Sequence, residues 1–265
     1  MIMATKKEIP ALPFFDLNAG QWFTADELAK NNIADPFYFR SSSVCKLMAS
    51  PEKLEIPTGA MTELEKMAGR IIYKTKPQFS NFAIEKGLLM EDVSIEMYCE
   101  VENTFAVKNK TRMYYWHPAH GILLTGECDL DDHCEQRGLS ITIDIKTAYS
   151  TETMPLFLKL GDRKGYEWQL CSYNVLFKTD LAKLAYCLPS TPEHLIKKGE
   201  PESWHIVDHI DLKYRVSIIE MVRDTNMVNQ LMNRLVICKQ KLIELVESKG
   251  YQIEKNIEYL EQEEE

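Results

Sequence analysis

Residues 126–147 read GECDLDDHCEQRGLSITIDIKT, and this stretch decides the fold. Its second half alternates strictly between apolar and polar residues, as a β-strand with one buried face does. The apolar positions are Leu139, Ile141, Ile143 and Ile145, and the polar positions are Ser140, Thr142, Asp144 and Lys146. Asp144 and Lys146 are therefore neighbours on one face of the predicted strand.

The first half of the stretch predicts the partner of this strand. A strand over residues 122–130 ends among the acidic residues Glu127, Asp129, Asp131 and Asp132. A turn containing Gly138 lets the two strands run antiparallel, which brings Asp129 to the level of Asp144. Two carboxylates and a lysine then converge, which suits a hard divalent cation with an ammonium group beside it. The alternative is a surface hairpin whose charges face solvent.

Length and composition indicate a soluble globular protein. The chain has 265 residues, of which 45% are hydrophobic and 27% charged. No apolar run approaches the roughly 20 residues of a membrane span, and the N-terminus MIMATKKEIP has no signal-peptide segment. We therefore expect a cytoplasmic protein without membrane contact. Seven cysteines are scattered without a CxxC pair, which favours reduced thiols over a zinc site or a disulfide framework.

The charge is distributed unevenly along the chain. The net charge is −9, but residues 254–265 hold six glutamates and one lysine, so this acidic tail carries −5 and the remainder about −4. Local basic surface matters more than net charge for phosphate contacts. Three basic patches could supply it, although each could equally be a solvated face: Lys66, Arg70, Lys74 and Lys76; Lys108, Lys110 and Arg112; and Arg163 and Lys164.

Helical periodicity dominates the first hundred residues. Capping boxes of Thr24 with Glu27 and of Thr62 with Glu65 predict helices over 25–30 and 61–73. A further helix over 82–99 has a core-facing stripe of Ile84, Leu88, Glu91, Ile95 and Tyr98. A carboxylate on a buried face needs a metal or an ion-pair partner. We therefore treat Glu91 as a candidate metal ligand; a buried ion pair, or a helix rotated so that Glu91 lies at its edge, are the alternatives.

Further elements follow from the same reasoning. Ser41, Ser42 and Ser43 precede an apolar helical segment over 44–48, so one of them is expected to cap it, and together with Arg40 they could form an anion site. Strands are predicted over 104–116, 183–188 and 204–210. A helix over 166–177 places Gln169 and Tyr173 on one face, and a long helix runs from Val228 to its end at Gly250.

These elements and motifs resemble the PD-(D/E)xK nuclease superfamily. The order of a helix, three strands, a helix and a strand matches its α/β core, a central mixed sheet flanked by helices. The chain looks most like the exonuclease branch that includes lambda-type exonuclease, YqaJ-like phage recombinases and RecB-type nuclease domains. Four motifs match in order: Arg40 with Ser41–Val44, Gly87-x-x-x-Glu91, Asp129 with Asp144-x-Lys146, and Gln169-x-x-x-Tyr173. Cys128 replaces the expected proline, which leaves Asp131 as an alternative to Asp129.

The resemblance implies a function and a set of site residues. It implies a Mg²⁺-dependent deoxyribonuclease, in which Mn²⁺ can substitute, with the metal held by Glu91, Asp129, Asp144 and the carbonyl of Ile145. Lys146, Gln169 and Tyr173 complete the catalytic group, and Arg40, Ser41–Ser43, Lys74, Lys76, Arg163 and Lys164 are the candidate DNA contacts. The iron–sulfur cysteines of some relatives have no counterpart, so no cluster is expected.

The resemblance also sets expectations about biology and domain organisation. The implied substrate is a double-stranded DNA end, degraded 5′ to 3′ in recombination or repair, with a single-strand annealing protein as partner and a homotrimer by analogy. A catalytically inactive binding module and a sequence-specific endonuclease are the alternatives. We expect one domain over 1–250, with a helical part over 1–100, a catalytic core over 101–190 and a C-terminal strand and helix over 191–250, before the tail at 251–265.

Overall fold

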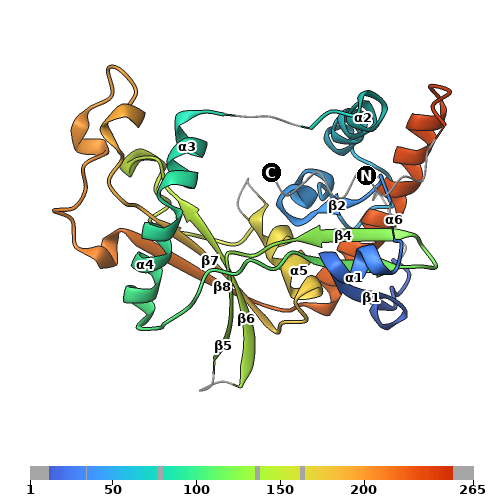
Figure 1. The fold of residues 1–265 in the computed structure, drawn as a ribbon, viewed down its shortest axis with the longest axis horizontal. Helices are drawn as coiled ribbons and strands as arrows, with labels where there is room; N and C mark the ends of the chain where they lie inside the picture. Colours follow the sequence, from blue (N-terminus) through green and yellow to red (C-terminus); the bar gives the residue numbers. More distant parts are fainter. Residues whose placement is uncertain (1–11, 34, 77–79, 135–137, 162–164, 253–265) are drawn as a thin grey trace, which may run out of the picture.

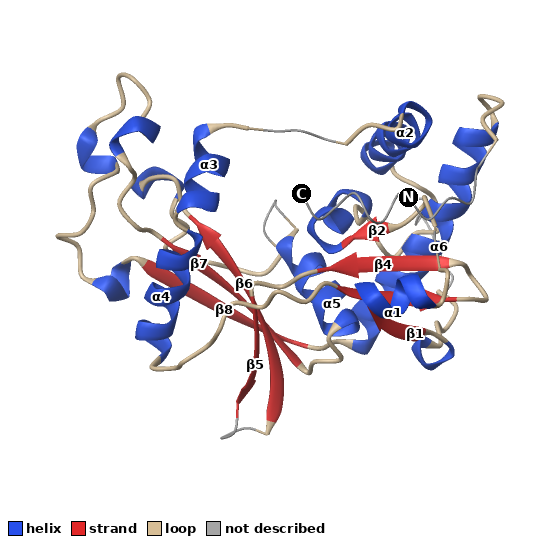
Figure 2. Ribbon diagram, viewed as in Figure 1, coloured by secondary structure: helices blue, strands red, loops and turns tan. Residues whose placement is uncertain are grey.

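The chain folds around two four-stranded sheets (Figures 1 and 2). The structure is a computed structural model that describes residues 12–33, 35–76, 80–134, 138–161 and 165–252. One sheet has the strand order β1-β3-β4-β2, with bounds Gln21–Thr24, Met113–His117, Ile122–Gly126 and Phe39–Arg40. The other has the order β5-β6-β7-β8, with bounds Leu130–Cys134, Leu139–Thr147, Leu181–Cys187 and Val216–Val222.

The second sheet is the mixed sheet that the sequence predicts. β6 pairs antiparallel with β5 and parallel with β7, and β8 pairs antiparallel with β7. The apolar face of β6 packs against helix α4 (Glu91–Glu102), where Ile141, Ile143 and Ile145 join a buried cluster with Ile95 and Tyr98. The predicted alternation of β6 and the α/β fold class are both confirmed.

The polar face of β6 is buried as well, contrary to the surface-hairpin alternative. Thr142 is 0% and Asp144 2% exposed. Helix α5 (Tyr166–Leu176) covers this face, and nine of its eleven residues are buried because it also contacts β3, β4 and the C-terminal helix. The charges of β6 therefore lie between a sheet and a buried helix, where each must be paired or bound.

The first sheet was not predicted, and it changes two strand assignments. The strand expected over 122–130 is two strands in different sheets, because β4 ends at Gly126 and β5 begins at Leu130. A Cβ atom on Gly126 would lie 2.3 Å from the Oγ of Ser41, so the chain can pass here only with glycine. The strand expected over 104–116 begins only at Met113.

The helical predictions need three corrections. The helix expected over 82–99 is two helices, α3 (Phe82–Leu89) and α4, separated at Met90, and Ile84 and Leu88 are exposed rather than core-facing. Helix α2 (Thr58–Tyr73) begins after Pro57 without the capping box predicted at Thr62. Ser41–Leu47 form a 3₁₀ helix without a side-chain cap. The capping box of Thr24 with Glu27 on α1 (Ala25–Lys30) is confirmed.

In the C-terminal part of the chain, one predicted element is wrong and one is confirmed. No strand forms at 204–210, which the structure describes completely, and β8 follows instead at Val216–Val222. Helix α6 (Thr225–Glu247) is confirmed, and its apolar stripe packs against α2 and α5. Gly250 adopts φ +70° just beyond it. Most of the acidic tail, residues 253–265, lies outside the described residues. None of the described helices is long and apolar enough to cross a membrane.

Candidate active site

The register of the β5–β6 hairpin places Asp129 beside the polar face of β6. Leu130 pairs with Ile143, and the backbone N–H of Asp129 donates to the carbonyl of Ile143 at 3.1 Å. The N–H of Ile145 donates to Oδ2 of Asp129 at 2.5 Å. Asp131 pairs opposite Thr142 instead, two residues along β6 from Asp144, and is exposed. The hairpin geometry therefore favours Asp129 over Asp131 as the partner of Asp144.

Asp144 and Lys146 form an ion pair on the buried face. Nζ of Lys146 lies 2.6 Å from Oδ2 of Asp144, and 5.6 Å from the ring centroid of Tyr166 at the start of α5. Apart from this ion pair, the buried Oδ2 atom has no hydrogen-bond partner within the described part of the chain. The sequence prediction that the two residues are neighbours on one face agrees with this contact.

Helix α5 supplies two further side chains to the same carboxylate. Nε2 of Gln169 donates to Oδ1 of Asp144 at 3.0 Å and to the hydroxyl oxygen of Tyr173 at 2.9 Å. The Tyr173 hydroxyl lies 3.0 Å from the carbonyl of Glu127 and 3.4 Å from Oδ1 of Asp144. Both side chains are buried. Gln169 and Tyr173 thus fix one oxygen of Asp144, while the other faces Lys146.

The two carboxylates shift the pKa values around them. Burial, reinforced by the negative charge of Asp144, raises the pKa of Asp129 to about 7. Burial alone would lower the pKa of Lys146, but its attraction to Asp144 and Asp129 outweighs this, so its pKa lies above the usual value for lysine. The site holds excess negative charge that disfavours ionised Asp129, and Lys146 is an ammonium ion at neutral pH.

This arrangement fits a divalent cation. Two carboxylates close enough to raise a pKa are stabilised together when a dication lies between them. The carbonyl of Ile145 faces the same edge of β6 as its N–H, which bonds Asp129, because both groups of one residue point to the same side of a strand. Within the described residues no three His, Cys, Asp or Glu side chains are already gathered as a metal site. Asp129, Asp144 and the Ile145 carbonyl form an incomplete ligand set.

Glu91 lies near this group but is held by another residue. It is the first residue of α4 rather than the middle of a buried stripe, and its side chain is 29% exposed. Oε2 of Glu91 accepts a hydrogen bond from Nζ of Lys108 at 2.7 Å. Its charge still contributes to the raised pKa of Asp129. Glu91 therefore forms an ion pair that is partly exposed rather than buried, and its charge acts on Asp129.

The predicted DNA contacts are distributed unevenly. Ser41 is buried, and its hydroxyl donates to the carbonyl of Thr125 at 3.2 Å, whereas Ser42 and Arg40 are exposed. The hydroxyl of Ser43 donates to the carbonyl of Arg40. Lys74 and Lys76 are exposed at the end of α2. Arg163 and Lys164 lie outside the described residues.

Two lysines in this region were not predicted as site residues. Lys108 appeared only as part of a basic patch, and its spacing from Glu91 gives no signal because a loop brings the two together. Lys86 is 0% exposed, and its ammonium group donates to the carbonyls of Tyr149 and Pro189 at 3.0 and 2.7 Å. The sequence did contain one indication for Lys86, because it is a lysine within the apolar pattern of α3.

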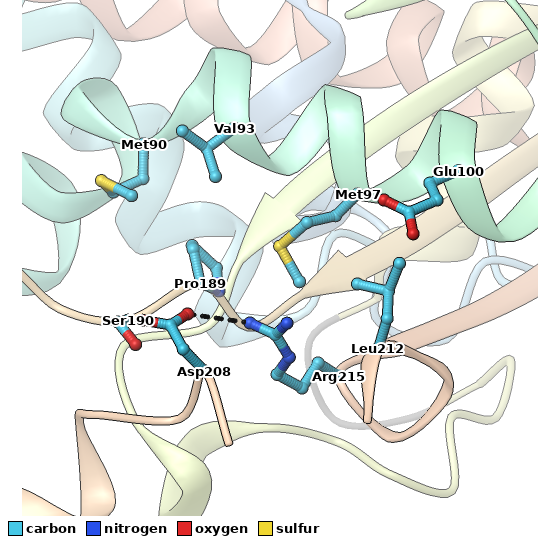
Figure 3. A pocket seen from close by; sticks show the side chains of 9 residues that line it. All are labelled: Met90, Val93, Met97, Glu100, Pro189, Ser190, Asp208, Leu212 and Arg215. Atoms are coloured by element: carbon cyan, nitrogen blue, oxygen red, sulfur yellow. Dashed lines mark hydrogen bonds and ion pairs between the residues drawn. The ribbon is translucent and has the colours of Figure 1, made fainter. Parts of the chain in front are cut away.

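A separate hollow of about 330 Å³ lies on another side of α4 (Figure 3). Met90, Val93 and Met97 form its apolar wall, and Arg215 pairs there with Asp208 at 3.2 Å. Its lining contains none of the residues around Asp129 and Asp144. We therefore treat the β5–β6 hairpin, and not this hollow, as the candidate active site.

No protein-family model matches the chain, and no curated protein matches it. Among solved structures, a phage-related exonuclease from Haemophilus somnus 129PT superposes with a TM-score of 0.68 at 21% identity, covering 80% of this chain and 96% of that one. An alkaline exonuclease from Laribacter hongkongensis superposes with a TM-score of 0.55 at 11% identity, covering 81% and 92%.

The chain has the fold of these exonucleases. A second structure of the Laribacter enzyme, in complex with dAMP, gives a TM-score of 0.54 at 12% identity and covers 85% of this chain and 96% of that one. The match extends over most of both chains. The resemblance seen in the sequence motifs is thereby confirmed at the level of the fold.

Proposed function

We propose that this protein is a metal-dependent DNA exonuclease that hydrolyses phosphodiester bonds at double-stranded ends. The observation that carries the proposal is the convergence of Asp129, Asp144 and Lys146 on one partly buried face. Carboxylates held beside an ammonium group are the equipment of metal-assisted phosphodiester hydrolysis. The exonuclease fold of the structural neighbours supports the same reaction class.

The ligands for the metal are Asp129, Asp144 and the carbonyl of Ile145, joined by Glu91. Mg²⁺ prefers oxygen ligands, and Mn²⁺ accepts the same set. When bound, the ion lowers the pKa of water and stabilises negative charge on the phosphate and the leaving oxygen. Gln169 and Tyr173 hold Oδ1 of Asp144, so they set the orientation of this carboxylate and leave its other oxygen toward Lys146.

Lys146 acts as a cation in this scheme. Its pKa lies above the usual value, so it is a poor proton acceptor at neutral pH. It orients the attacking water by donating a hydrogen bond and stabilises the charge that develops on the phosphate. The proton of the attacking water then passes to solvent or to a phosphate oxygen rather than to Lys146.

The DNA duplex is proposed to approach over basic surface outside this group. Arg40, just before the 3₁₀ helix, and Ser42, in its first turn, are exposed, and Lys74 and Lys76 are exposed after the end of α2. Arg163 and Lys164 precede α5 in sequence and are retained as candidate contacts. Ser41 is better assigned to supporting Gly126 than to DNA contact, because it is buried and already bonded to Thr125.

The biological setting is proposed by analogy with phage-type exonucleases. It comprises 5′ to 3′ polarity, a role in recombination or repair, a single-strand annealing protein as partner, a trimeric assembly and a location in the cytoplasm of the host. The Haemophilus neighbour is a phage-related exonuclease, which supports this setting.

End-labelled duplex DNA tests the proposal directly. Wild type is incubated in Mg²⁺ with duplexes labelled at the 5′ or at the 3′ end, beside Asp144→Asn and a reaction with EDTA. Release of labelled mononucleotide from the 5′ end by wild type alone is the expected result. Binding without release of nucleotides from either end, in Mg²⁺ and in Mn²⁺, would favour the inactive binding module instead.

A further inference from the structure

Lys108 is held next to the candidate metal ligands by its backbone. It forms a bridge with Leu130, and the N–H of the following residue, Asn109, donates to the carbonyl of Asp129 at 2.8 Å. The side-chain amide of Asn109 also donates to the carbonyl of Cys128 at 2.9 Å. The segment that carries Lys108 is therefore fixed on both sides of Asp129, unlike that of an ordinary surface lysine.

The ammonium group of Lys108 lies against Glu91, one of the proposed metal ligands. Its Nζ lies 2.7 Å from Oε2 of Glu91, with the two side chains 38% and 29% exposed. The hydrogen bond to Glu91 and, more weakly, the charges of Asp92 and Asp129 favour its charged form. A carboxylate that pairs with an ammonium group at this distance has one oxygen committed to the lysine. Glu91 can bind a metal through that oxygen only if Lys108 withdraws.

The charges of the site make such an exchange favourable. Lys108 pairs with Glu91 and Lys146 pairs with Asp144; together with Asp129, these five groups carry one negative charge when all are ionised. A divalent cation reverses this to one positive charge, and a single phosphodiester group then neutralises it. An ammonium group displaced from Glu91 would remain near the phosphate, because its backbone is fixed to residues 128–130.

We propose that Lys108 is a placeholder cation that neutralises Glu91 until a divalent metal binds. The metal displaces the ammonium group of Lys108 from Glu91, and this ammonium group then binds the DNA phosphate. Metal and DNA binding are thereby linked: the metal frees the ammonium group that receives the substrate. This inference rests on the proposed nuclease function, and it makes Lys108 a positioning residue with two successive partners, Glu91 before the metal binds and a phosphate afterwards.

The proposal predicts opposite effects of one substitution on two affinities. In Lys108→Met the metal has no competitor for Glu91, so Mn²⁺ binds about two- to fivefold more tightly, the size expected for the loss of a partly exposed ion pair. The Mn²⁺ affinity is measured by the loss of the electron paramagnetic resonance signal of the free ion. A short fluorescent DNA duplex, measured in Ca²⁺ by anisotropy, binds about two- to fivefold more weakly, because one phosphate contact is lost. Gel analysis verifies that the duplex stays intact.

Two further variants make the test specific. Lys110→Met removes an exposed lysine from the same segment and is expected to leave the Mn²⁺ affinity unchanged. Glu91→Gln weakens Mn²⁺ binding, and in that background Lys108→Met no longer tightens it, as a double-mutant cycle requires. Lys108→Arg retains most of the DNA affinity.

The outcomes separate this inference from the proposed function. If wild type binds Mn²⁺ but Lys108→Met binds it equally or more weakly, the placeholder role is wrong while the nuclease proposal stands. Tighter Mn²⁺ binding with unchanged DNA binding would overturn the second partner of Lys108. If wild type binds neither Mn²⁺ nor Mg²⁺, the proposed function and this inference are both overturned.

Discussion

Nζ of Lys146 lies 2.6 Å from Oδ2 of Asp144, two residues earlier on the same strand, and this ion pair is covered by the buried helix α5. Side chains two apart on a strand share a face, and here Asp144 is buried while the Lys146 side chain stays 27% exposed. The pair therefore has a structural as well as a chemical role, and the two roles are separable by mutation.

Lys146→Met should cost both activity and stability. It leaves the buried carboxylate of Asp144 without its cation, which is expected to lower the free energy of unfolding by about 1–3 kcal/mol. Urea denaturation without metal measures this. The double variant Asp144→Asn with Lys146→Met should recover most of the stability while remaining inactive. A double variant no more stable than Lys146→Met would contradict this account of the pair.

Tyr173→Phe should affect catalysis more than folding. The hydroxyl group contacts the carbonyl of Glu127 and Oδ1 of Asp144 and also accepts from Gln169, so its removal leaves Gln169 alone to hold this oxygen of the proposed metal ligand. We expect a stability loss of about 1 kcal/mol and a fall in kcat of roughly tenfold or more, by analogy with the loss of outer-shell partners of metal ligands. Equal kcat for Tyr173→Phe and wild type would exclude a positioning role.

Because of Asp129, we expect the stability of the metal-free protein to fall as the pH rises. Its pKa is raised from 3.8 to about 7 in the folded state, so the folded protein binds more protons than the unfolded chain between these values. The contribution of Asp129 to stability is therefore full below pH 4 and is lost as pH rises toward 7. Thermal unfolding of wild type and Asp129→Asn in EDTA measures it.

The Asp129→Asn variant should lose less stability than wild type over this range, and added Mg²⁺ should reduce the difference by binding the ionised carboxylate. Parallel pH profiles of the two proteins would show that the pKa of Asp129 is not raised in the folded state.

Lys86 predicts a second pH effect with a different range. Burial lowers the pKa of Lys86 to about 8, and its acceptors are two uncharged carbonyl groups. The unfolded chain binds more protons between pH 8 and the usual lysine value, so this residue makes the protein more stable as pH rises through that range. Thermal unfolding of wild type should show this rise, and that of Lys86→Met should not. An identical rise in both proteins would assign the effect to other groups.

The local alternation of β6 was enough to predict that Asp144 and Lys146 are neighbours, whereas the family resemblance was needed to single out the site residues. Asp144 and Lys146 share a face because a strand has a period of two, and Asp129 follows from the hairpin register. Gln169 and Tyr173 follow from the helical spacing of four. These relations lie within one element or one hairpin, so sequence periodicity contains them.

The features that the sequence did not predict depend on contacts between segments that are distant in the chain. The first sheet joins β1, β2, β3 and β4, and its parallel pair brings Phe39 beside Leu124, a relation that no local pattern records. The break at Met90 removes Glu91 from a continuous stripe, because α3 turns its apolar residues outward and buries Lys86 instead. The ion pair of Glu91 with Lys108 depends on the loop that returns from α4. Sequence periodicity predicted the strand and helices at the centre but not these connections.

Digestion of plasmid DNA tests the central claim most directly. Linear and covalently closed forms are incubated with wild type and Asp144→Asn in Mg²⁺, with an EDTA control. We predict that wild type degrades only the linear form, and that neither the variant nor the EDTA reaction degrades either form. Survival of both DNA forms with wild type, in Mg²⁺ and in Mn²⁺, would contradict the account, whereas cleavage of the closed circle would indicate an endonuclease on the same fold.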